Sequence, residues 1–86
     1  MKSSKPWFVY ILCCHDNSLY TGITTDLERR LSEHNETSKG ARYTRARRPV
    51  KLVYSEPAAD RSAASKREAQ LKSLPIAQKR ALIKAQ

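Results

Sequence analysis

Two residues able to bind phosphate and to move protons, Arg30 and His34, stand one turn apart in a segment patterned as an amphipathic helix. At about 100° per residue, Leu27 and Leu31 form its apolar stripe, and Arg30 and His34 fall beside them, whereas Glu33 falls on the outward side. A guanidinium and an imidazole on a core-facing stripe suit phosphate binding and acid–base work. The alternative is an Arg that extends past apolar neighbours and a His at a frayed helix end.

A carboxylate interrupts the apolar stripe of a second predicted helix. This stripe contains Ala64, Leu71 and Leu74, and Glu68 falls between them. Ionised carboxylates are rarely buried alone, so Glu68 needs a basic partner, a metal ion or a raised pKa. Taken by itself, Glu68 suits an ion pair with a core-side Arg as well as it suits a metal site. Because polar residues interrupt apolar stripes on two separate helices, we expect them to share one site.

Two tyrosines in neighbouring predicted strands form the third part of the pattern. A two-residue turn would pair Cys13 with Tyr20 and place Tyr10 on the opposite face of the sheet. A three-residue loop would pair Cys14 with Tyr20, and both tyrosines would then share a face. A single site requires the longer of these loops; otherwise each Tyr is an ordinary amphipathic core residue. Gly22 in the second strand predicts a bulge or a close backbone approach.

The order of these residues resembles the GIY-YIG nuclease family. Val9-Tyr10-Ile11 stands at the first motif triplet and Tyr20-Thr21-Gly22 at the second. The similarity covers residues 7–74 and continues through Thr24, Leu27, Arg30, His34 and Glu68. Two departures are visible: Val9 replaces the Gly of the first triplet, and no Asn follows Asn35 where some members have one near the C-terminus.

This resemblance implies metal-dependent hydrolysis of DNA phosphodiester bonds, in DNA repair, recombination or the processing of branched DNA. Glu68 would bind a single Mg²⁺ or Mn²⁺ ion, which stabilises the leaving oxygen. Tyr20 would orient or deprotonate the attacking water, with Tyr10 as its neighbour. Arg30 would assist the phenol and donate to the scissile phosphate. His34 would take a proton from Tyr or fix its hydroxyl.

A basic stretch without acidic residues follows the first predicted helix. Residues 39–49 resemble the small stand-alone bacterial members of the family, and also the catalytic subunit of the eukaryotic structure-specific endonuclease that cuts branched DNA. Gly40 and its small neighbours suit a loop along a phosphate backbone, and Tyr43 suits stacking on a base. The alternative is a solvated face. The expected nucleic-acid contacts are Lys39, Arg42, Tyr43, Arg45, Arg47, Arg48 and Lys51.

The elements that must position these side chains follow from the hydrophobic pattern. Residues 7–14 are continuously apolar, as is typical of a central strand covered on both faces. The expected strands are residues 7–14, 19–23 and 50–54, and the expected helices are residues 26–35, 58–74 and 75–85, with a loop or one short helix at 40–48. The fold class is therefore α/β (α+β). It is a small, mainly antiparallel three-stranded sheet flanked by helices in the order β-β-α-β-α-α.

The composition restricts the class of protein further. Eighty-six residues suit one domain, which we expect to span residues 1–86 with its core at 7–74 and a C-terminal helix at 75–85. Lys and Arg number 17 against 8 Asp and Glu, and this net charge of +9 favours a phosphate-rich partner such as DNA. No run approaches the roughly 18 apolar residues of a membrane span. The chain is also too apolar for a disordered basic tail.

The adjacent cysteines Cys13 and Cys14 favour reduced thiols in a cytoplasmic bacterial protein, where association with the nucleoid suits the charge. A zinc site with His15 and His34 is disfavoured, because three consecutive residues would have to converge on one ion. We expect a monomer or weak dimer and a separate targeting protein, since no DNA-binding domain is appended. The alternatives are a non-catalytic nucleic-acid-binding module on the same fold and a basic protein that serves a protein partner.

Overall fold

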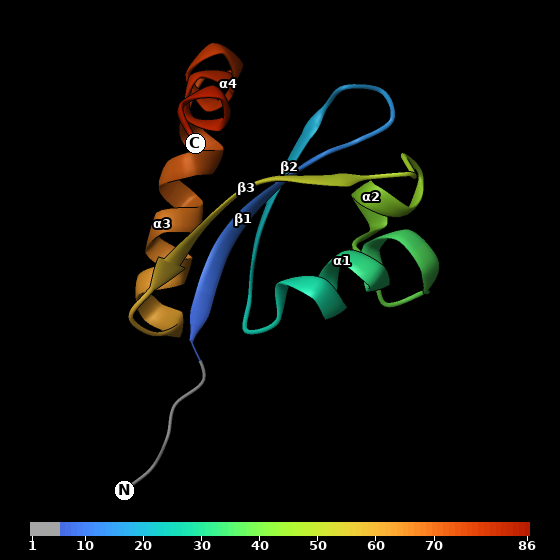
Figure 1. The fold of residues 1–86 in the computed structure, drawn as a ribbon, viewed down its shortest axis with the longest axis horizontal. Helices are drawn as coiled ribbons and strands as arrows, with labels where there is room; N and C mark the ends of the chain where they lie inside the picture. The colour runs from blue at the N-terminus through green and yellow to red at the C-terminus, as the bar shows by residue number, and fades with distance from the viewer. Residues whose placement is uncertain (1–5) are drawn as a thin grey trace, which may run out of the picture.

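The computed structural model describes residues 6–86; residues 1–5, which the sequence places in the expected domain, lie outside the described part. The elements in chain order are β1 (Trp7–Cys13), β2 (Leu19–Thr24), α1 (Leu27–Glu36), α2 (Arg42–Arg45), β3 (Lys51–Ala58), α3 (Arg61–Ser73) and α4 (Ile76–Ala85) (Figure 1). The order β-β-α-α-β-α-α confirms the predicted three-stranded mixed fold. The basic stretch forms the short helix α2, one of its two expected conformations.

The strand β1 lies at the centre of the sheet, whose order is β2-β1-β3 with both pairs antiparallel. Val9 and Ile11 are buried on one face against α3, and Tyr10 and Leu12 are buried on the other face beside α1. Burial on both faces explains why the sequence of β1 is continuously apolar. The two faces therefore differ in role: one packs an apolar core, and the other buries a tyrosine.

The β1–β2 hairpin differs from both predicted loop lengths. Residues 14–18 form a five-residue connection, so that Leu12 lies opposite Tyr20 and Tyr10 lies opposite Gly22. The connection closes through a hydrogen bond from Cys14 N to Ser18 O of 2.8 Å. Asn17 adopts a left-handed conformation with φ of 68°, which Asn tolerates well. The predicted pairings were wrong, but the observed one still places both tyrosines on one face.

Acidic side chains fix where the long helices begin. Asp26 accepts a hydrogen bond from Arg29 N at 3.0 Å before α1, and Asp60 accepts one from Ala63 N at 2.8 Å before α3.

The strand β3 continues to Ala58, beyond the expected residues 50–54 and into the expected start of α3. Its Pro57 is compatible with this extension because β3 is an edge strand.

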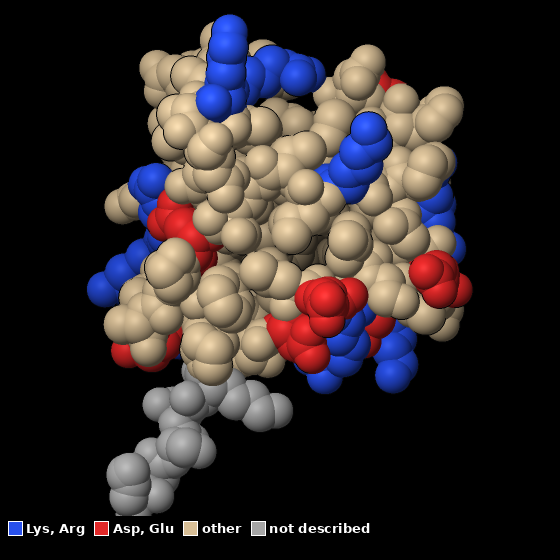
Figure 2. Space-filling view, in the orientation of Figure 1, with Lys and Arg blue, Asp and Glu red and all other residues tan. Residues whose placement is uncertain are grey.

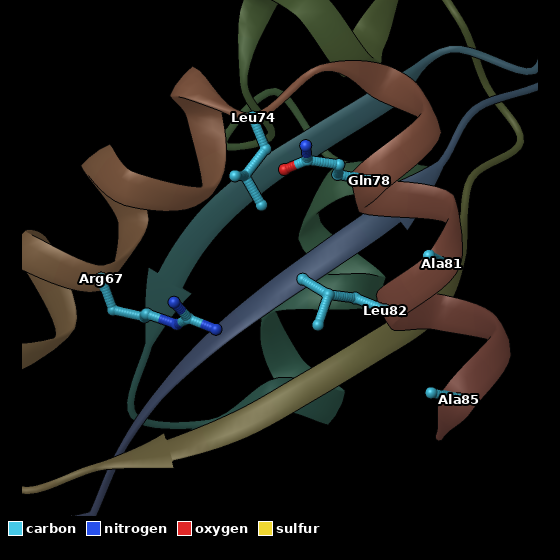
Figure 3. Close-up of a pocket in the computed structure, with 6 residues that line it drawn as sticks. All are labelled: Arg67, Leu74, Gln78, Ala81, Leu82 and Ala85. Carbon is cyan, nitrogen blue, oxygen red and sulfur yellow. The ribbon is translucent and has the colours of Figure 1, made fainter.

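The side of the sheet covered by α3 and α4 is mainly apolar. Leu74 and Leu82 pack against the core formed by Val9, Ile11 and Leu71. A hollow of about 390 Å³ lies between the two helices, lined by Arg67, Leu74, Gln78, Ala81, Leu82 and Ala85 (Figure 3). Among residues 6–86, no helix has the length and apolar character needed to cross a membrane.

Candidate active site

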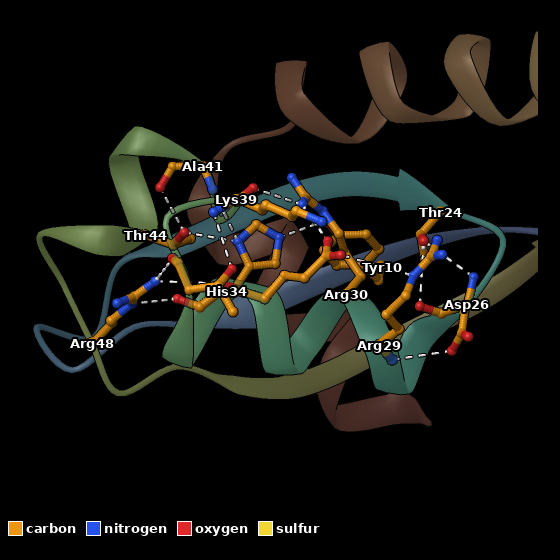
Figure 4. A network of polar contacts seen from close by, with 12 residues as sticks. Tyr10, Thr24, Asp26, Arg29, Arg30, His34, Lys39, Ala41, Thr44 and Arg48 are labelled. Carbon is orange, nitrogen blue, oxygen red and sulfur yellow. Dashed lines mark hydrogen bonds and ion pairs between the residues drawn. The ribbon is translucent and has the colours of Figure 1, made fainter.

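His34 is the centre of a buried polar network between α1, α2 and β1 (Figure 4). The side chain is 0% exposed, its Nε2 lies 2.8 Å from the Tyr10 hydroxyl, and its Nδ1 lies 2.8 Å from the Thr44 hydroxyl. Thr44 donates to the Ala41 carbonyl at 2.9 Å. Where its oxygen accepts from Nδ1–H, Nε2 accepts from Tyr10; the Ala41 amide N–H, 3.4 Å from Nδ1, competes with this tautomer. His34 thus lies on the core-facing stripe of α1 and not at a frayed end.

The environment of His34 strongly favours its neutral form. Burial lowers its pKa to about 4, and the positive charges of Arg30 and Arg48 act in the same direction. A neutral imidazole at pH 7 is consistent with a ring that donates through one nitrogen and accepts through the other. At neutral pH the network can therefore hold the Tyr10 hydroxyl without a buried charge.

We expect the folded protein to lose up to about 3 kcal/mol of stability between pH 7 and pH 4 through His34 alone. The histidine pKa is depressed on folding, from near 6.5 to about 4, so the unfolded chain binds a proton in this window that the folded chain does not. Urea unfolding at several pH values measures this loss. The variant His34→Gln should show a flatter pH dependence, and an unchanged slope would contradict this linkage.

Tyr10 reaches His34 by passing over Gly22 of the neighbouring strand. A Cβ atom added at Gly22 would lie 2.5 Å from the Tyr10 hydroxyl oxygen and 2.6 Å from its Cζ atom. The close approach expected at Gly22 is therefore present, and no register shift interrupts the β1–β2 pairing there. Burial raises the pKa of Tyr10 to about 12, which keeps the phenol protonated at neutral pH.

Tyr20 is the half-exposed member of the same cluster. Its ring centroid lies 6.5 Å from that of Tyr10, 5.3 Å from His34 and 6.1 Å from Tyr43. These distances bring both motif tyrosines and the helix histidine together. Of the two tyrosines, Tyr20 is the one that solvent or a substrate can reach.

Arg30 is held in place beside this cluster by α1 and the loop that follows it. Its Nη1 donates to Glu33 Oε1 at 2.8 Å and to the Lys39 carbonyl at 2.9 Å. Glu33 therefore lies against Arg30, with a side chain 19% exposed, and it also lies 3.9 Å from the outward Arg29. Both bonds use Nη1, and the guanidinium also lies close enough to Tyr10 to lower the pKa of its hydroxyl.

Glu68 lies half-buried on α3 and pairs within its own helix. Its Oε2 is 3.2 Å from Lys72 Nζ, so the basic partner is a lysine one turn further along α3 and not a core-side Arg. Burial is the main cause of the raised pKa of Tyr10, and the charges of Tyr20 and Glu68 add to it. The charge of Glu68 is the smallest of these contributions to the pKa of Tyr10.

The Arg48 guanidinium donates hydrogen bonds to backbone carbonyls of the folded chain. Its Nε donates to the His34 carbonyl at 2.6 Å, and its Nη2 donates to the carbonyls of Glu33 and Thr37. A cation at the C-terminal end of α1 satisfies carbonyls that lack helical partners and complements the helix dipole. The structure therefore gives Arg48, expected as a DNA contact, a helix-capping position that also anchors the backbone at His34.

Arg47 and Tyr43 are engaged with each other. The Arg47 guanidinium lies 3.8 Å from the centroid of the Tyr43 ring, and its Nε lies 3.1 Å from Asp16 Oδ2. One face of the ring is thus covered, and a base that stacked there would have to displace Arg47. The other expected cationic contacts are exposed and accessible: Lys39, Arg42, Arg45 and Lys51.

Three residues of this region were not identified from the sequence. Thr44 is 0% exposed and fixes the His34 ring, but it lies in a four-residue helix too short to show a periodic pattern. The ion pair of Glu33 with Arg30 was not expected either. Lys72 follows Glu68 by four residues, the spacing of a helical ion pair, so this signal was present in the sequence.

The donor set suits a loosely held hard cation better than a permanent metal centre. Among residues 6–86, no group of three or more His, Cys, Asp or Glu side chains converges to hold an ion. Two carboxylates act on the cluster: Glu33 is bound by Arg30, and the charge of Glu68 contributes to the pKa of Tyr10. Mg²⁺ and Mn²⁺ accept one carboxylate together with water and phosphate oxygens. Glu68 therefore fits an ion whose coordination the substrate completes. Cys13 and Cys14 are both free thiols.

Comparison with known proteins identifies the family. The GIY-YIG catalytic domain matches residues 6–80. The chain belongs to the GIY-YIG family. The match confirms the resemblance inferred from the order of Tyr, Gly, Arg, His and Glu in the sequence. GIY-YIG domains form a superfamily of endonucleases whose members typically use a divalent metal ion.

Relatives of this GIY-YIG chain include bacterial proteins that are named UPF0213 proteins. One from Desulfotalea psychrophila is 62% identical over 79 residues, which are 92% of this chain and 72% of that protein. The solution structure of a UPF0213 protein from Bacillus halodurans is 40% identical with a TM-score of 0.60, over 94% of this chain and 85% of that one. The solution structure of a protein from E. faecalis is 45% identical with a TM-score of 0.63, and the match covers 99% of this chain and 90% of that one.

Proposed function

We propose that this GIY-YIG chain is a metal-dependent endonuclease that hydrolyses DNA phosphodiester bonds. The observation that carries the proposal is the convergence of Tyr10, Tyr20 and His34 on one face of the sheet, with Arg30 held beside them. A module that only bound nucleic acid would not need a buried phenol–imidazole pair beside a carboxylate. The basic surface of α2 supports DNA as the substrate.

In the proposed reaction, the oxygen of a water molecule attacks phosphorus, and the bond from phosphorus to the leaving oxygen breaks. Tyr20 orients the attacking water, because it is the motif tyrosine that reaches solvent. The attacking water loses its proton to solvent, and the leaving oxygen takes up a proton from solvent. Tyr10 and His34 hold the site's geometry through their 2.8 Å hydrogen bond. The low pKa of His34 supports this positioning role over a role as a strong base.

Charge stabilisation in this proposal comes from Arg30 and Glu68. Arg30 donates to a non-bridging oxygen of the scissile phosphate through Nη2, while Glu33 and the Lys39 carbonyl hold its other terminal nitrogen. Glu68 binds Mg²⁺ or Mn²⁺, and the bound ion supplies stabilisation of the leaving oxygen. Lys72 must release Glu68 for this, which a partly exposed i,i+4 pair permits because such pairs are worth only about 0.5 kcal/mol.

The same fold supports a second candidate, a non-catalytic nucleic-acid-binding module. One observation favours it: Glu68 already has a cationic partner in Lys72. Both candidates bind DNA, and only the nuclease requires a metal ion. We propose repair, recombination or branched-DNA processing in the bacterial cytoplasm as the setting of the nuclease, with a separate protein for targeting.

Removal of divalent ions separates the two candidates. We expect the purified chain to convert supercoiled plasmid to nicked circles with Mg²⁺ or Mn²⁺ and to stop in excess EDTA, because Glu68 alone cannot stabilise the leaving oxygen. Gel quantification of nicked circles over time measures the rate, and added Mg²⁺ should restore it. DNA binding by gel shift without any metal-dependent nicking, on plasmid and on branched DNA, would favour the binding module.

A further inference from the structure

A hollow on the outer side of β2 carries positive charge that the proposed catalytic set does not use. It measures about 220 Å³ and is lined by Leu19, Tyr20, Thr21, Tyr43, Lys72 and Lys79. Tyr20 belongs to both the hollow and the tyrosine–histidine cluster, so the two are adjacent. No acidic residue lines the hollow, and its two lysines come from different helices, α3 and α4.

The two lysines differ in what neutralises them. Lys72 pairs with Glu68 at 3.2 Å, but Lys79 takes part in none of the ion pairs found among residues 6–86. Two ammonium groups that face one hollow repel each other unless an anion lies between them. If Glu68 binds a cation, Lys72 loses its partner, and the positive potential of the hollow rises at the moment a phosphate arrives.

The position of Lys79 is fixed by contacts of its helix. Arg80, the next residue on α4, donates from Nη2 to the Asn17 carbonyl at 2.9 Å and so ties α4 to the β1–β2 loop. Lys79 itself is half-buried. Figure 2 shows one face of the molecule, on which Lys and Arg side chains over α4 have no acidic neighbours, whereas acidic and basic side chains mix over α1.

We propose that this hollow binds the DNA backbone phosphate next to the scissile one, with Lys79 and Lys72 as its cationic contacts. The assignment rests on the proposed nuclease function and extends it. A strand would pass from the basic surface of α2, across Tyr20, to α4 at the edge of the sheet. Tyr20 and Tyr43 form an aromatic wall against which the adjoining sugar packs.

The test is DNA binding in EDTA, which is independent of catalysis. Fluorescence anisotropy with a labelled 20-base-pair duplex, at several salt concentrations, should show about a three- to tenfold higher Kd for Lys79→Ala than for the wild type. The slope of log K against log salt should fall by about one. Lys79→Arg should restore both, and Lys84→Ala, an exposed lysine on the same helix outside the hollow, should match the wild type.

Amide NMR spectra of the unmodified chain provide a second measurement that no folding defect can affect. Adding the unlabelled duplex in EDTA should shift the amide signals of Leu19, Thr21 and Lys79. The assignment is overturned by an unchanged Kd and salt slope in Lys79→Ala, or by shifts confined to residues 39–51. Loss of nicking in the wild type with these binding effects intact would instead refute the nuclease alone.

Discussion

Replacing Glu68 with glutamine should lower the rate of plasmid nicking about a thousandfold while the chain stays folded. The amide has nearly the same size as the carboxylate but lacks the charge that binds a hard cation, so the leaving oxygen loses its stabilisation. Little stability depends on this charge, because its partner is Lys72 in a partly exposed i,i+4 pair worth about 0.5 kcal/mol. Thermal unfolding should therefore be nearly unchanged.

The matched control is Glu28→Gln. Glu28 is an exposed acid in the first turn of α1 that takes part in none of the ion pairs found among residues 6–86, so the same chemical change there should leave nicking intact. Initial rates at several Mn²⁺ concentrations complete the measurement. A Glu68→Gln rate within about threefold of the wild type would mean that the carboxylate is not the metal ligand, and that Lys72 is its permanent partner.

The sequence predicted the candidate site best where a regular period decides which way a side chain faces. The 3.6-residue period of α1 placed His34 on the buried stripe beside Leu31, and the structure buries it completely. The continuous apolar run of β1 likewise predicted a central strand. In both cases the signal is geometric, because a helix or strand repeats its orientation along the chain.

The sequence predicted the contacts between elements less well. The loop of residues 14–18 has no period, so its length and the resulting register of Tyr20 opposite Leu12 could not be derived from the order of residues. The hydrogen bond from Arg30 to the Lys39 carbonyl joins two groups that the chain brings together only after α1 ends. Polar networks of this kind depend on tertiary structure, whereas apolar faces follow from local pattern.

Among substitutions of uncharged residues, Gly22→Ala should have the largest effect. The added Cβ would lie 2.5 Å from the Tyr10 hydroxyl oxygen, closer than two such atoms can approach, so the Tyr10 ring must move. Tyr10 is only 2% exposed, and its displacement would break the hydrogen bond to His34. We expect a loss of about 2 kcal/mol in the free energy of unfolding and about a hundredfold lower nicking rate.

A double-mutant cycle assigns this cost to the Tyr10 contact and not to the backbone of β2. Gly22 has no positive φ, so alanine is compatible with its conformation, and the three atoms nearest to the added Cβ all belong to the Tyr10 side chain. In a Tyr10→Ala background, Gly22→Ala should therefore cost less than about 0.5 kcal/mol, a coupling of about 1.5 kcal/mol or more, measured by urea unfolding. Equal costs in both backgrounds would show that Gly22 is required for another reason. A strong coupling together with the loss of nicking would show that Gly22, the glycine of the second triplet, is required because the Tyr10 ring of the first triplet packs over it.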